Sequence, residues 1–215
     1  MTPKAQSAAT RDIAALAPII PVLVIEDLAH AEPLARALIA GGLPALEVTL
    51  RTPCALEAIR VMAAVPGGVV GAGTLLTPED VQAAKRAGAR FGVSPGATPR
   101  LIAACAEEGL PLLPGAATAS EVMALFEQGY DMLKFFPAEA AGGAPALKSI
   151  GGPISQVSFC PTGGVTPENA PAYLSLPNVI CAGGSWVAPK SAMEAGDWAA
   201  IETLARQAAQ LGPRA

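Results

Sequence analysis

The sequence predicts an α/β protein with a (β/α)8 barrel (TIM barrel) fold, and three observations support this prediction. Eight short apolar runs recur along the 215 residues, and stretches with helical start and stop signals separate them. Strict alternation of strands and helices, with strands that are apolar along their length, is typical of a parallel sheet covered on both faces. Eight such units in one chain of this length favour a closed barrel, and an open doubly wound sheet is the structural alternative.

The apolar runs define the predicted strands in chain order. They are residues 18–25, 45–50, 69–74, 91–95, 111–115, 132–136, 156–162 and 178–183. Residues 1–12 are predicted to be an N-terminal extension or a short helix. Residues 13–215 are predicted to form one barrel domain, because no change of composition marks a second domain.

Capping motifs predict where the helices begin. Thr77-Pro-Glu-Asp and Thr166-Pro-Glu-Asn each place a threonine at the N-cap, a proline in the first turn and an acid near the positive end of the helix. Thr52 and Thr98 precede proline in the same way, and Thr118 has a glutamate three residues later, as in a capping box. Glycines mark the predicted helix ends, at Gly41, Gly42, Gly88, Gly109 and Gly129.

Composition excludes several classes of function. The net charge is −4 and no basic cluster occurs, which argues against a nucleic-acid partner. No apolar run is long enough to span a membrane, and the first residues lack the apolar segment of a signal peptide, so a cytoplasmic location is expected. The four cysteines show no CxxC spacing and are interpreted as reduced core residues; they are Cys54, Cys105, Cys160 and Cys181. His30 is the only histidine, so no metal site of the His/Cys type is expected.

Polar residues lie at the C-terminal ends of the predicted strands, where barrel enzymes carry their chemistry. Glu47, Thr49 and Arg51 share one face of the strand at 45–50, and the apolar residues between them share the other. The apolar face must pack on helices, so the polar face points into the barrel. Glu47 and Arg51 are ~13 Å apart along a strand, too far for a direct ion pair, which favours function over structure. The two glycines of the run Gly71-Ala-Gly let another group approach the backbone closely, and Thr74 after them is a hydroxyl donor at the mouth; a structural bulge is the alternative.

Lys134 stands in the apolar run 132–136, between aliphatic and aromatic residues. Such surroundings disfavour the charged ammonium and yield a nucleophilic amine. An inward-facing carboxylate such as Glu47 would favour the ammonium instead, but it would also supply the proton transfers of Schiff-base chemistry. A lysine that reaches solvent, or that forms a structural ion pair, is the alternative.

Glycine pairs follow the last two predicted strands. Gly163 and Gly164 come after the seventh strand. Gly183 and Gly184 come at the end of the eighth, and Ser185 follows them. Glycine-rich loops expose backbone N–H groups, and a helix N-terminus after the loop would add positive potential. Barrels commonly bind phosphate at this position. Together with Lys134 and Glu47, the loops indicate a lyase or isomerase that acts on the carbonyl group of a small phosphorylated substrate.

Six short motifs in this order resemble the bacterial class I aldolases for 2-keto-3-deoxy-6-phosphogluconate (KDPG) and 4-hydroxy-2-oxoglutarate. They are EVTLRTP at 47–53, GAGT at 71–74, SPG at 94–96, LKFFPAE at 133–139, CPTGG at 160–164 and GGSW at 183–186. The resemblance extends from about residue 13 to about residue 205. LKFFPAE and CPTGG together are highly specific, whereas GAGT or SPG alone is not.

The resemblance implies a role for each candidate site residue. Lys134 matches the lysine that forms the Schiff base with the keto acid, and Glu47 matches the general acid/base. Arg51 and Thr74 match groups that bind the carboxylate of the pyruvate half. Thr162 matches a threonine linked to stereochemical preference at the aldol centre. The phosphate-binding residues match Gly163, Gly164, Gly184 and Ser185.

The reaction implied by the resemblance is the cleavage of KDPG to pyruvate and glyceraldehyde 3-phosphate, the last step of the Entner–Doudoroff pathway. The resemblance also implies a homotrimer that needs neither a metal nor a cofactor. Three alternatives stay open: an aldolase for the epimeric galactonate-derived substrate, a phosphate-binding isomerase or epimerase that forms no imine, and a non-catalytic barrel that binds a phosphorylated metabolite.

Overall fold

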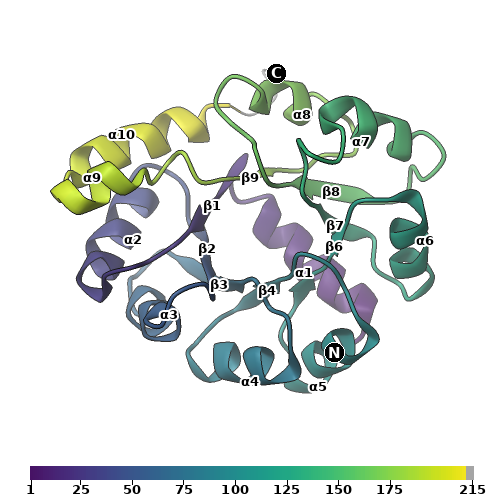
Figure 1. The fold of residues 1–215 in the computed structure, drawn as a ribbon, viewed down its shortest axis with the longest axis horizontal. Helices are drawn as coiled ribbons and strands as arrows, with labels where there is room; N and C mark the ends of the chain where they lie inside the picture. Colours follow the sequence, from purple (N-terminus) through teal and green to yellow (C-terminus); the bar gives the residue numbers. More distant parts are fainter. Residues whose placement is uncertain (212–215) are drawn as a thin grey trace.

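The computed structural model describes residues 1–211 and has an α/β fold in which helices surround a curled set of parallel strands (Figure 1). The strands are β1 (Ile19–Leu23), β2 (Ala45–Thr49), β3 (Val69–Gly73), β4 (Phe91–Val93), β5 (Leu112–Leu113), β6 (Gly115–Ala116), β7 (Met132–Phe135), β8 (Ser158–Pro161) and β9 (Ala182–Gly184). The helices are α1 (Pro3–Ala14), α2 (Ala31–Ala40), α3 (Ala55–Ala63), α4 (Pro78–Arg86), α5 (Pro99–Glu108), α6 (Ala119–Glu127), α7 (Gly143–Gly151), α8 (Ala170–Leu174), α9 (Lys190–Ala195) and α10 (Trp198–Ala209), with a 3-10 turn at Leu28–His30. None of these helices has the length and apolarity needed to cross a membrane.

The strands form two parallel sheets. One has the order β5-β4-β3-β2-β1-β9, and the other has the order β6-β7-β8. Single parallel bridges join Phe159 to Val179 and Thr162 to Gly183, which places the end of β8 beside β9. The strands therefore follow one another in space in the order in which they occur along the chain.

Six of the eight predicted strands coincide with single observed strands, with ends that differ by up to two residues. The predicted strand at 111–115 is divided into β5 and β6. Pro114 separates β5 from β6 and has no N–H to donate, so β5 pairs with β4 while β6 pairs with β7. The eighth predicted strand, at 178–183, is displaced toward the C-terminus. Only its end belongs to β9, which pairs with β1, whereas Val179 makes a single bridge to β8.

Two separate buried clusters lie on opposite faces of the strands. The inner cluster comprises Ala14, Ile20, Ala45, Phe91, Val93, Leu113, Met132, Cys160 and Cys181. The outer cluster joins the other face of the strands, including Leu46, Val48 and Leu133, to the helices. Each fully buried large apolar side chain contributes about 1.5–3 kcal/mol, so the larger outer cluster holds the helices in place. Strand alternation then puts Glu47 with Ala45, and Lys134 with Met132, on the inner face.

The capping prediction is confirmed for three helices. Thr77 accepts from the Asp80 N–H, and the Asp80 carboxylate accepts from the Thr77 N–H, which completes a capping box at α4. Thr118 and Glu121 form a second box at α6. Thr98 caps α5 with its side chain.

At two other positions the capping prediction is wrong. α3 begins at Ala55 after Cys54, and the Thr52 hydroxyl donates to the Ile25 carbonyl instead of capping the helix. α8 begins only at Ala170, after a turn in which Thr166 and Asn169 exchange reciprocal hydrogen bonds like those of the box at α4. The same Thr-Pro-Glu sequence therefore starts α4 directly but starts α8 one turn late.

Of residues 1–12, predicted as an extension or short helix, all but the first two belong to α1, which ends at Ala14 and packs against β5 and β7. The buried Gln6 side chain accepts from the Leu112 N–H at the first residue of β5. Arg11 forms an ion pair with Asp131 at 2.9 Å and donates to Ser158 at the first residue of β8. α1 therefore covers the N-terminal ends of the strands, opposite the ends that carry the predicted site.

Candidate active site

The structure brings Lys134 and Glu47 together on the inner face of the strands. Lys134 Nζ lies 3.3 Å from Glu47 Oε1, and only 6% and 4% of the two side chains are exposed. Lys134 stands on β7 of one sheet, and Glu47 stands on β2 of the other. A charged pair at this depth carries a high desolvation cost, and a buried ion pair is weak evidence for a stabilising role. The arrangement is that of an amine with a proton acceptor within hydrogen-bonding reach.

Two neighbouring residues fix the surroundings of this pair. A Cβ on Gly73 would lie 2.3 Å from Glu47 Oε1, so the space that the carboxylate occupies exists because residue 73 has no side chain. The Phe136 ring lies beside the amine, with its centroid 5.2 Å from Lys134 Nζ, close enough for a cation–π contact with the ammonium. The glycine run predicted a close approach of another group at this point, but not that the group is Glu47. Sequence reasoning gave Phe136 no task of its own, and its signal was its place in the LKFF run.

Arg51 and Thr74 meet at the mouth, just beyond the ends of the adjacent strands β2 and β3. Arg51 is exposed, and its Nε donates to Thr74 Oγ1 at 3.3 Å. Thr74 has φ 63°, a left-handed conformation that a β-branched residue adopts only at a cost of about 1–3 kcal/mol. Strain of this kind clusters at ligand-binding sites, and here it holds a hydroxyl beside a guanidinium. Thr49, from the same face of β2, instead donates its hydroxyl to the Leu23 carbonyl within the sheet.

The Gly163–Gly164 loop presents free backbone donors. Both glycines have positive φ, 101° and 77°, and their N–H groups donate to no acceptor among residues 1–211. The N–H groups of Ser185 and Trp186 are likewise without an acceptor within the described part of the chain. The bridge between Thr162 and Gly183 sets the two loops side by side. Four unpaired N–H groups on adjacent loops form a concave site suited to an anion.

One part of the sequence argument for phosphate binding needs correction. The helix after the Gly163–Gly164 loop was expected to add the positive potential of its N-terminus. α8 starts six residues beyond Gly164 and has only five residues, and α9, after the other loop, has six. A macrodipole grows from many aligned peptide units, so these short helices contribute little. The free N–H groups carry the argument.

Thr162 and Trp186 pack against the glycines of the last strand. A Cβ on Gly183 would lie 2.3 Å from Thr162 Oγ1, so the buried threonine needs a glycine opposite it. A Cβ on Gly184 would likewise overlap the Trp186 ring, which folds back over this glycine. Both contacts bring the side chains of the last two loops close to the backbone.

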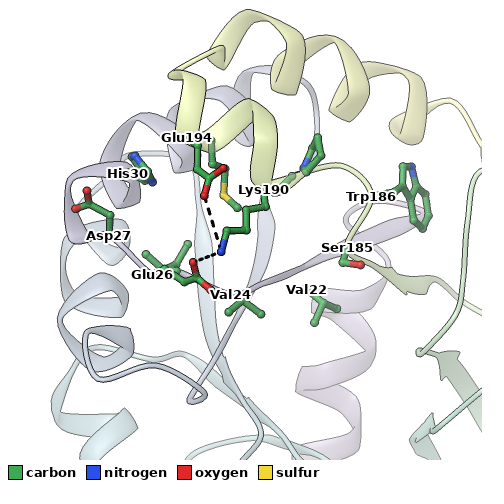
Figure 2. A pocket seen from close by; sticks show the side chains of 13 residues that line it. Val22, Val24, Glu26, Asp27, His30, Ser185, Trp186, Lys190 and Glu194 are labelled. Atoms are coloured by element: carbon green, nitrogen blue, oxygen red, sulfur yellow. Dashed lines mark hydrogen bonds and ion pairs between the residues drawn. The ribbon is translucent and has the colours of Figure 1, made fainter.

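A cavity of about 700 Å³ opens beside these loops, between the end of β1 and α9 (Figure 2). Ser185 and Trp186 line one side of it, whereas neither Lys134 nor Glu47 reaches it. The opposite side carries Lys190 2.6 Å from Glu26, and hydrogen bonding to this carboxylate raises the pKa of the lysine. The cavity therefore borders the loop after β9 and has an ion pair at its rim.

The four cysteines and His30 are the remaining candidates from the sequence. Three of the cysteines are buried and Cys54 is half-buried, and no disulfide joins them. Burial raises the pKa of the Cys105 thiol to about 12, which leaves it protonated. The His30 ring packs edge-on against Trp198 with centroids 5.6 Å apart. No group of three or more metal-ligating side chains gathers in the described residues.

A family model for KDPG and KHG aldolases matches residues 11–204. The chain belongs to this aldolase family. It is 52% identical to the KHG/KDPG aldolase of Escherichia coli K12 over 194 residues, which are 90% of this chain and 91% of the relative.

Two solved structures of family members superpose closely. The 2-keto-3-deoxy-6-phosphogluconate aldolase of Zymomonas mobilis ZM4, crystallised with 3-phosphoglycerate, has a TM-score of 0.91 at 52% identity, covering 95% of this chain and 97% of the other. The KDPG aldolase of Legionella pneumophila, with pyruvate captured as a covalent carbinolamine intermediate, has a TM-score of 0.90 at 47% identity, covering 93% and 98%. The resemblance inferred from six motifs is thus confirmed over nearly the whole chain.

Proposed function

We propose that this protein is a class I aldolase that cleaves 2-dehydro-3-deoxy-6-phosphogluconate (KDPG) to pyruvate and D-glyceraldehyde 3-phosphate. The observation that carries the proposal is the buried pair of Lys134 and Glu47, 3.3 Å apart on the inner face of the strands. Membership of the aldolase family supports it, as do the relatives that were solved with 3-phosphoglycerate and with a pyruvate carbinolamine. 4-Hydroxy-2-oxoglutarate is a second proposed substrate, since the relative in Escherichia coli is a KHG/KDPG aldolase.

In the proposed mechanism, the neutral Lys134 amine attacks the C2 carbonyl of the keto acid. Glu47 delivers a proton to the carbonyl oxygen, and water leaves as the carbinolamine becomes a protonated imine. The carboxylate then takes the proton of the C4 hydroxyl, the C3–C4 bond breaks, and its electrons move into the imine to give an enamine. Protonation at C3 and hydrolysis of the imine release pyruvate and the free amine.

The other predicted residues bind the two ends of the substrate in this proposal. Arg51 and Thr74 hold the carboxylate next to C2, and the guanidinium supplies the charge-assisted hydrogen bonds. The phosphate lies against the adjacent loops at Gly163, Gly164, Gly184 and Ser185, where it accepts from the free N–H groups of Gly163, Gly164 and Ser185. Thr162, which is buried against Gly183, contacts the aldol centre. Binding at both ends fixes C2 near Lys134, and such positioning supplies much of the catalysis.

The protonated imine is the electron sink of the reaction, so the proposed mechanism uses neither a metal nor a cofactor. EDTA is therefore expected to leave the activity unchanged. Strong inhibition by the chelator would point to a metal-dependent aldolase instead. Kinetics with KDPG and with the epimeric 2-dehydro-3-deoxy-6-phosphogalactonate distinguish the proposed substrate from the galactonate-derived alternative.

We also infer that the strands close into a complete (β/α)8 barrel, with β5 and β6 counted as one strand. The parallel bridges between β8 and the segment before and within β9 support closure, and so does the division of the core into inner and outer clusters. We further propose, from family resemblance alone, a cytoplasmic enzyme that works as a homotrimer. Light scattering on the purified protein tests the assembly.

The decisive test is to trap the imine. Incubation with pyruvate and borohydride should add the reduced pyruvate moiety to Lys134, and peptide mass spectrometry locates it. Lys85→Met is the matched control, because Lys85 lies on α4 and donates only to the Gly109 carbonyl, and it should label as the wild type does. An unlabelled Lys134 in the wild type would refute the Schiff-base mechanism.

A further inference from the structure

The Gly163–Gly164 loop is held from behind by residues that sequence reasoning assigned to no role. The Glu139 N–H donates to the Gly163 carbonyl at 3.0 Å. The Glu139 side chain lies against Gly164, where a Cβ would come within 2.8 Å of both its Cβ and its Cγ. Glu139 therefore sets the position of both glycines, one through its backbone and one through its side chain.

The Glu139 side chain is in turn held by Tyr173. The hydroxyl of this tyrosine, whose side chain is buried in α8, donates to Glu139 Oε1. A carboxylate on an otherwise exposed residue is thereby fixed in one orientation. A hydrogen bond to a charged group is stronger than one between neutral groups, so this contact is well suited to hold a loop.

A third contact reaches the same loop from the start of α8. Asn169 Nδ2 donates to the Gly164 carbonyl at 3.0 Å, while its Oδ1 accepts from the Thr166 N–H at 2.8 Å. The carbonyl groups of Gly163 and Gly164 are thus both occupied on one side of the loop, and the N–H groups of these residues stay free. The donors that would bind phosphate are preorganised by partners that do not touch it.

We propose that Glu139 and Tyr173 are positioning residues for phosphate, which act through the Gly163–Gly164 loop on the phosphorylated half of the substrate and not on the chemistry at Lys134. This inference rests on the proposed function for the identity of the anion. Loss of either contact lets the glycine N–H groups spread over several orientations. The binding of phosphate then weakens, while imine formation with pyruvate, which has no phosphate, proceeds as before.

Tyr173→Phe is the main test, because it removes one oxygen and keeps the buried ring. The Michaelis constant for KDPG should rise about tenfold, a loss of about 1.4 kcal/mol in binding, with kcat changed less than twofold. The dissociation constant for inorganic phosphate should rise by a similar factor in a calorimetric titration. Borohydride trapping of pyruvate should keep its wild-type rate. Glu139→Ala should behave like Tyr173→Phe, whereas Glu139→Gln keeps an acceptor oxygen and the packing on Gly164, and should restore most of the affinity.

Tyr130→Phe is the matched control. Tyr130 is also fully buried, and its hydroxyl donates to Gln6 at the opposite end of the strands. This variant loses the same oxygen and should bind phosphate as the wild type does. Equal losses in Tyr130→Phe and Tyr173→Phe, equal losses of pyruvate trapping and phosphate affinity, or a wild type that binds no phosphate would each overturn the inference. A wild type that binds phosphate but forms no adduct with pyruvate would refute the proposed function and leave the positioning role standing.

Discussion

Replacing Gly73 with alanine should damage catalysis more than it damages the fold. The added Cβ would lie 2.3 Å from Glu47 Oε1, whereas ordinary contact begins at 3.4 Å. The carboxylate would therefore have to move by the difference, about 1.1 Å, away from its place 3.3 Å from Lys134 Nζ. A misplacement of about 1 Å at a reacting group costs on the order of 100-fold in rate, and that is the fall in kcat we expect.

Release of pyruvate from KDPG, followed by its reduction with lactate dehydrogenase and NADH, measures this loss. Calorimetric unfolding of the same samples measures stability, which should fall by about 1–3 kcal/mol, because the added Cβ also overlaps Glu47 Cγ and Cδ, at 2.7 and 2.9 Å, in a buried site. Gly92→Ala is the matched control. Its Cβ would meet Leu75 Cδ1 at 2.5 Å on the outer face of the neighbouring strand, so it should cost stability without a comparable loss of kcat. Full activity in Gly73→Ala would refute the assignment of Glu47 as the proton-transfer group.

Three further changes have expected outcomes. Lys134→Met should abolish cleavage and, because it leaves Glu47 buried without its partner, should lower the free energy of unfolding by about 3–5 kcal/mol in a urea titration; residual cleavage near the wild-type rate would place the nucleophile elsewhere. Thr77→Ala removes a capping box and should cost about 1 kcal/mol with kcat unchanged. Hydrogen bonding from the Ala117 N–H is the main cause that lowers the pKa of Glu121, so this group stabilises the fold above its unfolded pKa and loses that contribution as pH falls through its folded value. Glu121→Gln should therefore be less stable than the wild type at pH 7, and the gap should close in acid; a gap independent of pH would contradict the linkage.

Local patterns predicted the strands well because their signals lie within a few residues. Glu47 and Lys134 could be assigned to inward faces from alternation alone, and the structure sets them 3.3 Å apart. The glycines after the last two strands could be assigned to one site because parallel strands end at one edge. Family motifs then gave each residue a chemical role, which remains to be tested.

The features that sequence reasoning missed depend on contacts between distant segments. The task of Gly73 follows from the position of the Glu47 side chain on the adjacent strand, which no spacing encodes. Thr52 has the local form of a helix cap, yet its hydroxyl finds the Ile25 carbonyl from another loop. Tyr173 and Glu139 are 34 residues apart, and only the folded chain brings them together. Local propensity is a weak prior when tertiary partners compete for the same group.

The filled end of the strands below Lys134 determines how substrate enters and how products leave. Phe91 and Met132 fill the interior below Lys134, and α1 covers the starts of the strands beneath them. With the lower end filled, substrate and products pass through the mouth, where the glycine loops and Arg51 lie. The aldehyde fragment, held near the opening, is expected to depart first, and pyruvate, covalently attached at the bottom, follows after hydrolysis. In the proposed mechanism the covalent bond to Lys134 sets this order, and the filled lower end directs both products through the mouth.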